Sequence, residues 1–215
     1  MKTKREIVYS VIEFISGFNV TDDSPYDEQL IGDKVDDVRA LLIKQQWAQQ
    51  RKVDDEYYQL QELKIEHAPI TDSDDAVKLY SFSVTFPPLL SGIGWDNIKY
   101  LGKKNMAENY NRRSMSGYSA ARGRRWSQKY VDYTVIDATR AIIRNEKLTK
   151  EIIIHGLFKS PTDVDGCTFD TPYPVPDPFK LEMIVKQDIG AGLGIPPDLK
   201  NDARHNTEQL TGQRE

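Results

Sequence analysis

The sequence predicts an α+β fold, in which an N-terminal helical hairpin and a returning C-terminal helix pack with an antiparallel β-rich middle. An extended C-terminal arm follows. Apolar residues recur every three to four positions near the N-terminus, short β-branched and aromatic stretches fill the middle, and a third helical pattern follows a proline-rich passage. We expect a hairpin at 1–56, a β region at 57–160, a proline-rich passage and third helix at 161–195, and an arm at 196–215.

Two amphipathic patterns joined by a short linker predict the antiparallel hairpin. The first helix is expected at 4–17, with an apolar face made of Ile7, Val8, Val11, Ile12, Ile15 and Phe18. Ser24 is expected to cap the second helix, with Pro25 in its first position. The buried stripe of that helix is Ile31, Val35, Val38 and Leu42, widened by Leu30, Leu41 and Trp47, and the helix continues to residue 50.

Four stretches of the middle are predicted to be antiparallel strands, at 58–65, 79–84, 130–136 and 151–155. Residues 98–130 have weak periodicity and many turn-forming residues, and they predict a long basic loop. This loop holds nine basic residues and one acid, Glu108. Its net charge of +8, in a chain of net charge −4, leaves −12 for the remainder. This asymmetry indicates a surface that meets a partner.

The third helix is predicted from its cap and its apolar stripe. Asp177 is expected as the N-cap and Pro178 as the first helical residue, and the glycines at 190–194 end the helix. Its stripe is Leu181, Ile184, Val185 and Ile189. The arm that follows is polar and has few large apolar side chains, so we expect a partner to supply the free energy that orders it.

The sequence contains no arrangement of residues typical of catalysis or metal binding. His67, His155 and His205 lie far apart without ligand spacing, and Cys167 is the single cysteine. Residues 163–166 approach a calcium loop but lack its bidentate glutamate. We therefore expect no catalytic residues, no metal and no cofactor. Glu13 interrupts the first apolar stretch and no run is long enough to span a bilayer, so no membrane association is expected.

The basic loop supplies the candidate binding residues. Guanidinium groups pair with carboxylates or phosphates, and aromatic rings add stacking area. With no acid among the five arginines of 112–125, charge repulsion in the loop favours a partner over a solvated loop, and a protein surface over DNA. The candidates are Arg112, Arg113, Arg122, Arg124, Arg125 and Trp126.

Several short passages, taken in order, resemble the ring proteins of the head-to-tail connector of crAss-like bacteriophages, most closely the first ring protein below the portal. Residues 31–43 resemble an adaptor helix that carries the Arg39-Ala40 pair. Residues 152–161 are similar to the strand and Gly-hydrophobe-Phe-x-x-Pro turn of these proteins, and 173–176 to the stretch before their helix. The arm resembles the family's Pro-x-Asp-x-x-Asn-Asp-Ala pattern at Pro197, Asp198, Asn201 and Asp202.

The resemblance implies a non-enzymatic structural subunit of a tailed-phage virion, made in the cytoplasm of the bacterial host. Such a subunit would join itself in a roughly twelvefold ring around the DNA channel. It would contact the portal protein and other ring and tail proteins, and it could touch packaged DNA nonspecifically. The alternative, from the residues alone, is a small nucleic-acid-binding protein that acts through the basic loop.

Overall fold

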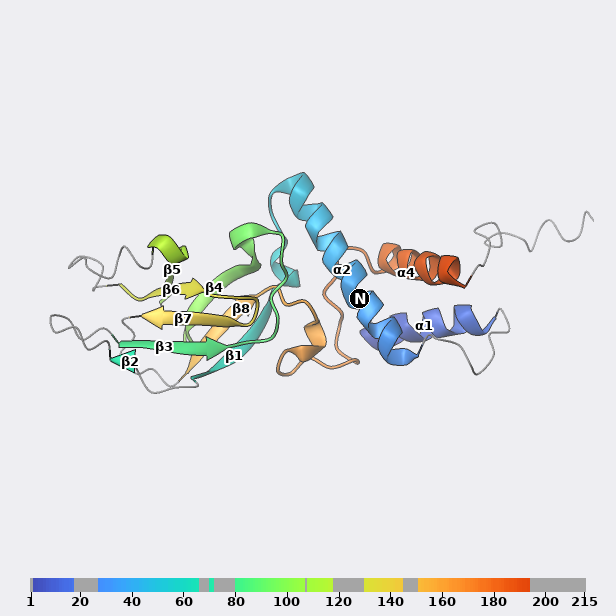
Figure 1. The fold of residues 1–215 in the computed structure, drawn as a ribbon. Coiled ribbons are helices and arrows are strands. Elements are labelled where there is room, and N and C mark those ends of the chain that lie inside the picture. Colours follow the sequence, from blue (N-terminus) through green and yellow to red (C-terminus); the bar gives the residue numbers. More distant parts are fainter. Residues whose placement is uncertain are drawn as a thin grey trace, which may run out of the picture.

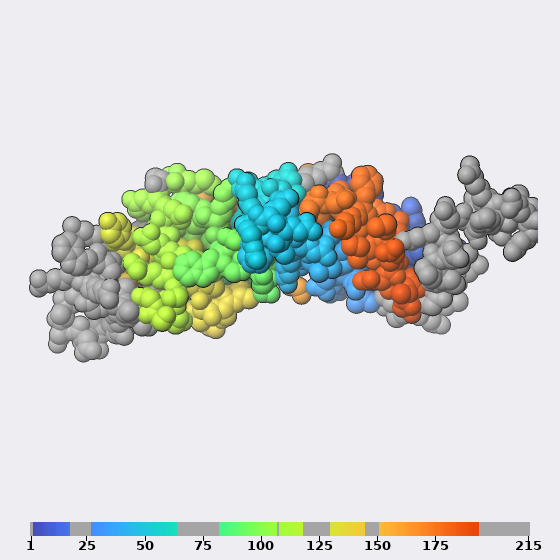
Figure 2. All heavy atoms as spheres, turned by 90° about the horizontal axis from the view of Figure 1, so that it is seen from above, coloured from blue at the N-terminus to red at the C-terminus, as the bar shows by residue number. Residues whose placement is uncertain are grey.

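The molecule is elongated, with helices at one end and a curled sheet at the other (Figures 1 and 2). The computed structural model describes residues 2–17, 27–65, 70–71, 80–106, 108–117, 130–144 and 151–193. The helices are α1 (Lys4–Ser16), α2 (Glu28–Gln50) and α4 (Pro178–Gly192). The strands are β1 (Gln59–Ile65), β2 (Ile70–Thr71), β3 (Tyr80–Thr85), β4 (Ile98–Lys103), β5 (Asn111–Arg112), β6 (Asp132–Val135), β7 (Arg140–Arg144) and β8 (Ile152–Gly156). The predicted α+β class is confirmed.

Side-chain caps fix where the helices begin. Asp177 accepts hydrogen bonds from the first turn of α4 and Pro178 follows it, as the sequence predicted. Thr3 caps α1 in a reciprocal capping box. The start of α2 differs from the prediction, because its cap is Asp27 and its first residue is Glu28. The predicted cap, Ser24, lies outside the described residues.

The hairpin of α1 and α2 is antiparallel, and α4 packs against both helices (Figure 1). Lys4, at the start of α1, meets Asp36 well inside α2, while the chain connects the end of α1 to the start of α2. Leu30 and Leu41 do not widen the buried stripe, because they are 45% and 46% exposed on the outer side of α2. The helical core is Ile7, Val8, Val11, Ile15, Ile31, Val35, Val38, Leu42, Tyr173, Val175, Leu181, Val185 and Ile189.

The sheet has the order β4-β8-β1-β3-β7-β6-β5, with β2 beside β3. The pairs are antiparallel except β5–β6, which is parallel. Two of these strands correct the predicted loop at 98–130, since β4 pairs along β8 and β5 pairs with β6. A further strand, β7, was not predicted from the sequence and lies between β3 and β6. These strands are set by long-range partners, which the local pattern does not show.

The sheet curls so that the outer edge of β4 meets the chain just before β5. Gly102 forms an isolated bridge with Asn109, and the N–H of Tyr110 donates to Leu101 O at 2.8 Å. A Cβ atom on Gly102 would lie 2.0 Å from Glu108 O, so only glycine permits this close approach. The curled sheet encloses a core of Leu63, Phe82, Val84, Phe86, Leu89, Ile98, Leu101, Tyr110, Tyr133, Ala141, Ile143, Ile152, Ile154, Phe158 and Val164.

Arg39, on α2, ties the two halves of the molecule together. Its side chain is fully buried and donates to Pro174 O at 2.7 Å and Phe158 O at 2.9 Å, with Tyr57 O further away at 3.5 Å. These carbonyls belong to the passage before α4, the segment after β8 and the approach to β1. Burial lowers the pKa of Arg39, although the neighbouring Tyr173 and Asp36 oppose this shift. One planar guanidinium thus holds three distant segments.

A second buried polar group reinforces this joint. Asp36 Oδ2 accepts from Lys4 Nζ at 2.9 Å, and Asp36 Oδ1 accepts from Tyr173 Oη at 2.5 Å. Burial and the Asp36 carboxylate raise the pKa of Tyr173 well above its ordinary value, so its hydroxyl stays a donor. The far half of α2 meets the strand half through the apolar cluster of Ala40, Ile43, Val53, Tyr57, Leu90, Ile93 and Leu157, with Trp47 against it.

Candidate partner-binding surfaces

Arg112 of β5 holds an exposed tryptophan in place. Its guanidinium lies over the ring of Trp95, 5.3 Å from the centroid, and its Nη1 donates to Trp95 O at 2.7 Å and to Asn97 Oδ1 at 2.9 Å. Trp95 belongs to the short 3-10 turn Gly94–Asn97 and is 58% exposed. Burial lowers the pKa of Arg112, while Tyr133 and Asp96 act in the opposite direction. The first candidate binding residue is therefore paired with an aromatic residue that the sequence did not single out.

The turn that carries Trp95 is also fixed from its other side. Asp96 Oδ2 accepts from Trp47 Nε1 of α2 at 2.6 Å, and Asp96 O accepts from Tyr58 Oη at 2.7 Å. The turn therefore has hydrogen-bonded contacts to α2, to the approach to β1 and to β5. Trp95 is an exposed aromatic side chain on a well-braced turn, which is the setting typical of interface hot spots.

Arg113, the second candidate, pairs with an acid inside the molecule. Its Nε lies 2.7 Å from Asp132 Oδ2 as an ion pair without hydrogen-bond alignment, and Arg144 Nη2 lies 2.9 Å from the same oxygen. Asp132 is fully buried and Arg144 nearly so. The argument that these arginines lack an acid therefore does not hold for Arg113, because Asp132 comes from β6. This cluster ties together the two places where the basic segment joins the sheet.

The remaining predicted binding residues are not placed by the structure. Arg122, Arg124, Arg125 and Trp126 lie outside the described residues, and so do Pro197, Asp198, Asn201 and Asp202 of the arm. The structure shows that the described chain stops at Gly117 and resumes at Tyr130, next to β6. The proposed role of the basic residues between these positions still rests on the sequence.

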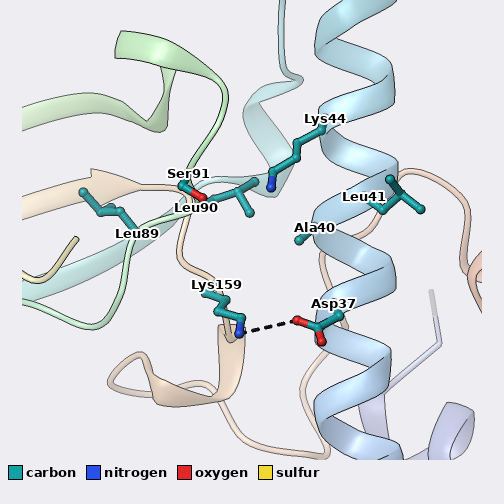
Figure 3. Close-up of a pocket in the computed structure, with 8 residues that line it drawn as sticks. All are labelled: Asp37, Ala40, Leu41, Lys44, Leu89, Leu90, Ser91 and Lys159. Carbon is teal, nitrogen blue, oxygen red and sulfur yellow. Dashed lines mark ion pairs between the residues drawn. The ribbon is translucent and has the colours of Figure 1, made fainter. Parts of the chain in front are cut away.

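A hollow of about 280 Å³ lies where α2 meets the strand half (Figure 3). One wall is α2 and the other is formed by residues 89–91 and the chain after β8. Lys159 Nζ and Asp37 Oδ1 lie 3.4 Å apart at its edge, and both side chains are largely exposed. Its lining is Asp37, Ala40, Leu41, Lys44, Leu89, Leu90, Ser91 and Lys159. The mixture of lysines, one aspartate and aliphatic side chains is suited to contact and contains no nucleophile activated by a base.

A second hollow of about 190 Å³ lies between the first half of α2 and the end of α4. Lys34 Nζ and Asp188 Oδ2 form an ion pair there at 3.0 Å. The lining also contains Leu30, Asp33, Asp37 and Ile189. Because Asp37 lines both hollows, the outer side of α2 is recessed both toward α4 and toward the strand half.

His155 of β8 is a structural neighbour of this region. It packs against the Tyr58 ring at a centroid distance of 5.6 Å, and burial together with nearby Lys99 lowers its pKa below 6.5. Within the described part of the chain, no three His, Cys, Asp or Glu side chains gather as metal ligands. In the same part of the chain, no helix is long and apolar enough to cross a membrane.

Comparison with known families assigns the chain. The family described as phage tail ring protein 2, of the crAss-like group, matches residues 6–209. The chain belongs to this family. It is therefore a structural component of a phage tail, and its place is in the virion. The crAss-like ring protein resemblance of the sequence is confirmed.

The family description refines the resemblance in one respect. The sequence appeared closest to the first ring protein, below the portal, whereas the family is that of ring protein 2. The match supports association with other ring and tail proteins and does not assign a portal contact. No curated protein matches the chain.

Proposed function

We propose that this subunit forms a ring of the head-to-tail connector, roughly twelvefold, through which the DNA channel passes. Its role is mechanical and non-enzymatic. The single observation that carries the proposal, beyond family membership, is the braced joint at Arg39 and Asp36, which gives an elongated subunit one fixed shape. A ring transmits position from copy to copy, and this requires subunits that do not bend at the joint.

The proposed partners are further copies of the chain and neighbouring ring and tail proteins, with the portal as the partner expected on the head side. The arm at 196–215 is proposed to order on such a partner. Deleting it should change the free energy of unfolding by less than about 0.5 kcal/mol, because it adds little to the helical core. The same deletion should strongly reduce incorporation into particles. Unfolding of the truncated chain would show that the arm belongs to the subunit's own core.

The basic segment separates the proposed function from the nucleic-acid-binding alternative. Replacing Arg122, Arg124 and Arg125 together by Ser should weaken association with ring or tail proteins and leave the fold intact. The matched control is Arg140→Ser, since Arg140 pairs locally with Asp137 in an exposed turn. Particles that assemble normally but lose their DNA would favour a channel-lining role. A solitary chain of 24.7 kDa that binds duplex with steep salt dependence would favour the alternative function.

A further inference from the structure

The inference concerns how one copy contacts the next, and it rests on the proposed ring function. A closed ring of identical subunits is built from heterologous contacts, in which two different surfaces of the same chain meet. The described part of the chain carries two such surfaces with matching chemistry. They are the Trp95–Arg112 corner and the hollow between α2 and α4.

The Trp95–Arg112 corner is a protruding group with an open edge. The hydrogen bonds of Arg112 use Nη1, and its Nε–Nη2 edge makes no hydrogen bond within the described residues. That edge is the one that can bind a carboxylate with two parallel hydrogen bonds. It lies against the exposed indole of Trp95, so the corner can take a carboxylate beside an apolar group.

The hollow between α2 and α4 offers that combination. Of its three carboxylates, Asp188 pairs with Lys34 and Asp37 lies near Lys159. Asp33 is exposed and makes no ion pair in the part of the chain that the structure describes. Beside it, Leu30 is 45% exposed and supplies an apolar wall.

The two surfaces lie apart on the same rigid element. Trp47 of α2 holds the turn that carries Trp95, and Asp33 lies fourteen residues earlier on α2. At 1.5 Å per residue this is a separation of about 20 Å along the helix. The helix therefore sets the spacing between the protruding corner and the hollow, as a repeating contact requires.

Duplex DNA fits the Trp95–Arg112 corner less well. Asp96 adjoins Trp95, and Asp55 lies on the neighbouring Lys99, so carboxylates surround the arginine and would repel phosphates. An intact duplex also has no exposed base face on which the indole could stack. We propose that Trp95 and Arg112 of one copy dock in the α2–α4 hollow of the next copy, with the Arg112 guanidinium paired to Asp33.

The test is a charge exchange, read by the mass of the assembly in solution and in purified particles. Trp95→Ala, Asp33→Arg and Arg112→Glu should each raise the concentration needed for assembly by about 30-fold, the effect expected when a hot-spot contact is lost. The double variant Asp33→Arg with Arg112→Glu should recover most of this loss, because the pair is restored with its charges exchanged. Arg140→Glu is the matched control and should assemble normally.

The outcomes separate the contact from the ring. Arg112→Glu also removes hydrogen bonds to the turn, but Trp95 and Asp33 are exposed, so variants of these two residues keep the fold and decide the question. Wild-type rings that tolerate Asp33→Arg would overturn the docking, as would singles that weaken without recovery in the double variant. A wild-type chain that is monomeric both in solution and in particles would instead refute the ring itself.

Discussion

Replacing Arg39 by alanine should cost a large part of the subunit's stability. The guanidinium makes two short hydrogen bonds to buried carbonyls, at 2.7 and 2.9 Å, and the third contact at 3.5 Å is too long to add much. Hydrogen bonds that involve a charged group contribute about 1.5–3 kcal/mol each, so the loss should be about 3–6 kcal/mol. Since the whole free energy of unfolding of a domain is about 5–15 kcal/mol, such a loss is easily measured.

Urea unfolding followed by circular dichroism is the appropriate assay. Arg39→Ala should lower the midpoint and separate the unfolding of the helical half from that of the strand half. Arg39→Lys should recover little, because an ammonium cannot reproduce the planar fork that spans Pro174 O and Phe158 O. Arg5→Ala is the control, since Arg5 forms an exposed pair with Asp170 and should cost less than about 1 kcal/mol. A loss below about 1 kcal/mol for Arg39→Ala would refute the view that this residue holds the joint.

Three further predictions concern the strand half. Asp132→Asn should destabilise the fold by about 3–5 kcal/mol, measured by the same unfolding assay, because two guanidiniums lose their shared buried carboxylate; a neutral effect would contradict this. Gly102→Ala should cost about 2 kcal/mol or more, since its Cβ would clash with Glu108 O, and a melting temperature equal to the wild type would argue against the close approach. The lowered pKa of His155 means that the unfolded chain binds its proton first as the pH falls below 6.5. The free energy of unfolding should therefore decrease below that pH, and His155→Gln should flatten the decrease.

The features that the sequence predicted correctly are those encoded within a few residues. Asp177 and Pro178 specify the start of α4 because a cap and a proline at the first helical position act locally. Strand β8 was predicted because an isoleucine run has the same appearance whichever strands flank it. The basic segment differs, because β4 and β5 exist only through their pairing with β8 and β6.

The candidate site could be predicted only in part for the same reason. Arg112 was found by charge, but its partner Trp95 lies on a short turn with no periodic signal. The available hint was local, since Gly92 and Gly94 both have positive φ and mark the turn that carries the indole. The acid that pairs with Arg113 was missed because Asp132 is nineteen positions further along the chain and reaches it through the β5–β6 pair.

The Leu30 and Leu41 error carries the functional information. Helical spacing allowed either leucine to widen the buried stripe, and only the placement of α1 and α4 decides which face of α2 is covered. Both leucines instead line hollows on the outer face, where no element of the described chain covers them. An isolated exposed leucine needs no explanation, but two on one recessed face, with Asp37 between them, are typical of a surface that meets another protein. In a tail ring protein, that face of α2 is where a neighbouring subunit is expected.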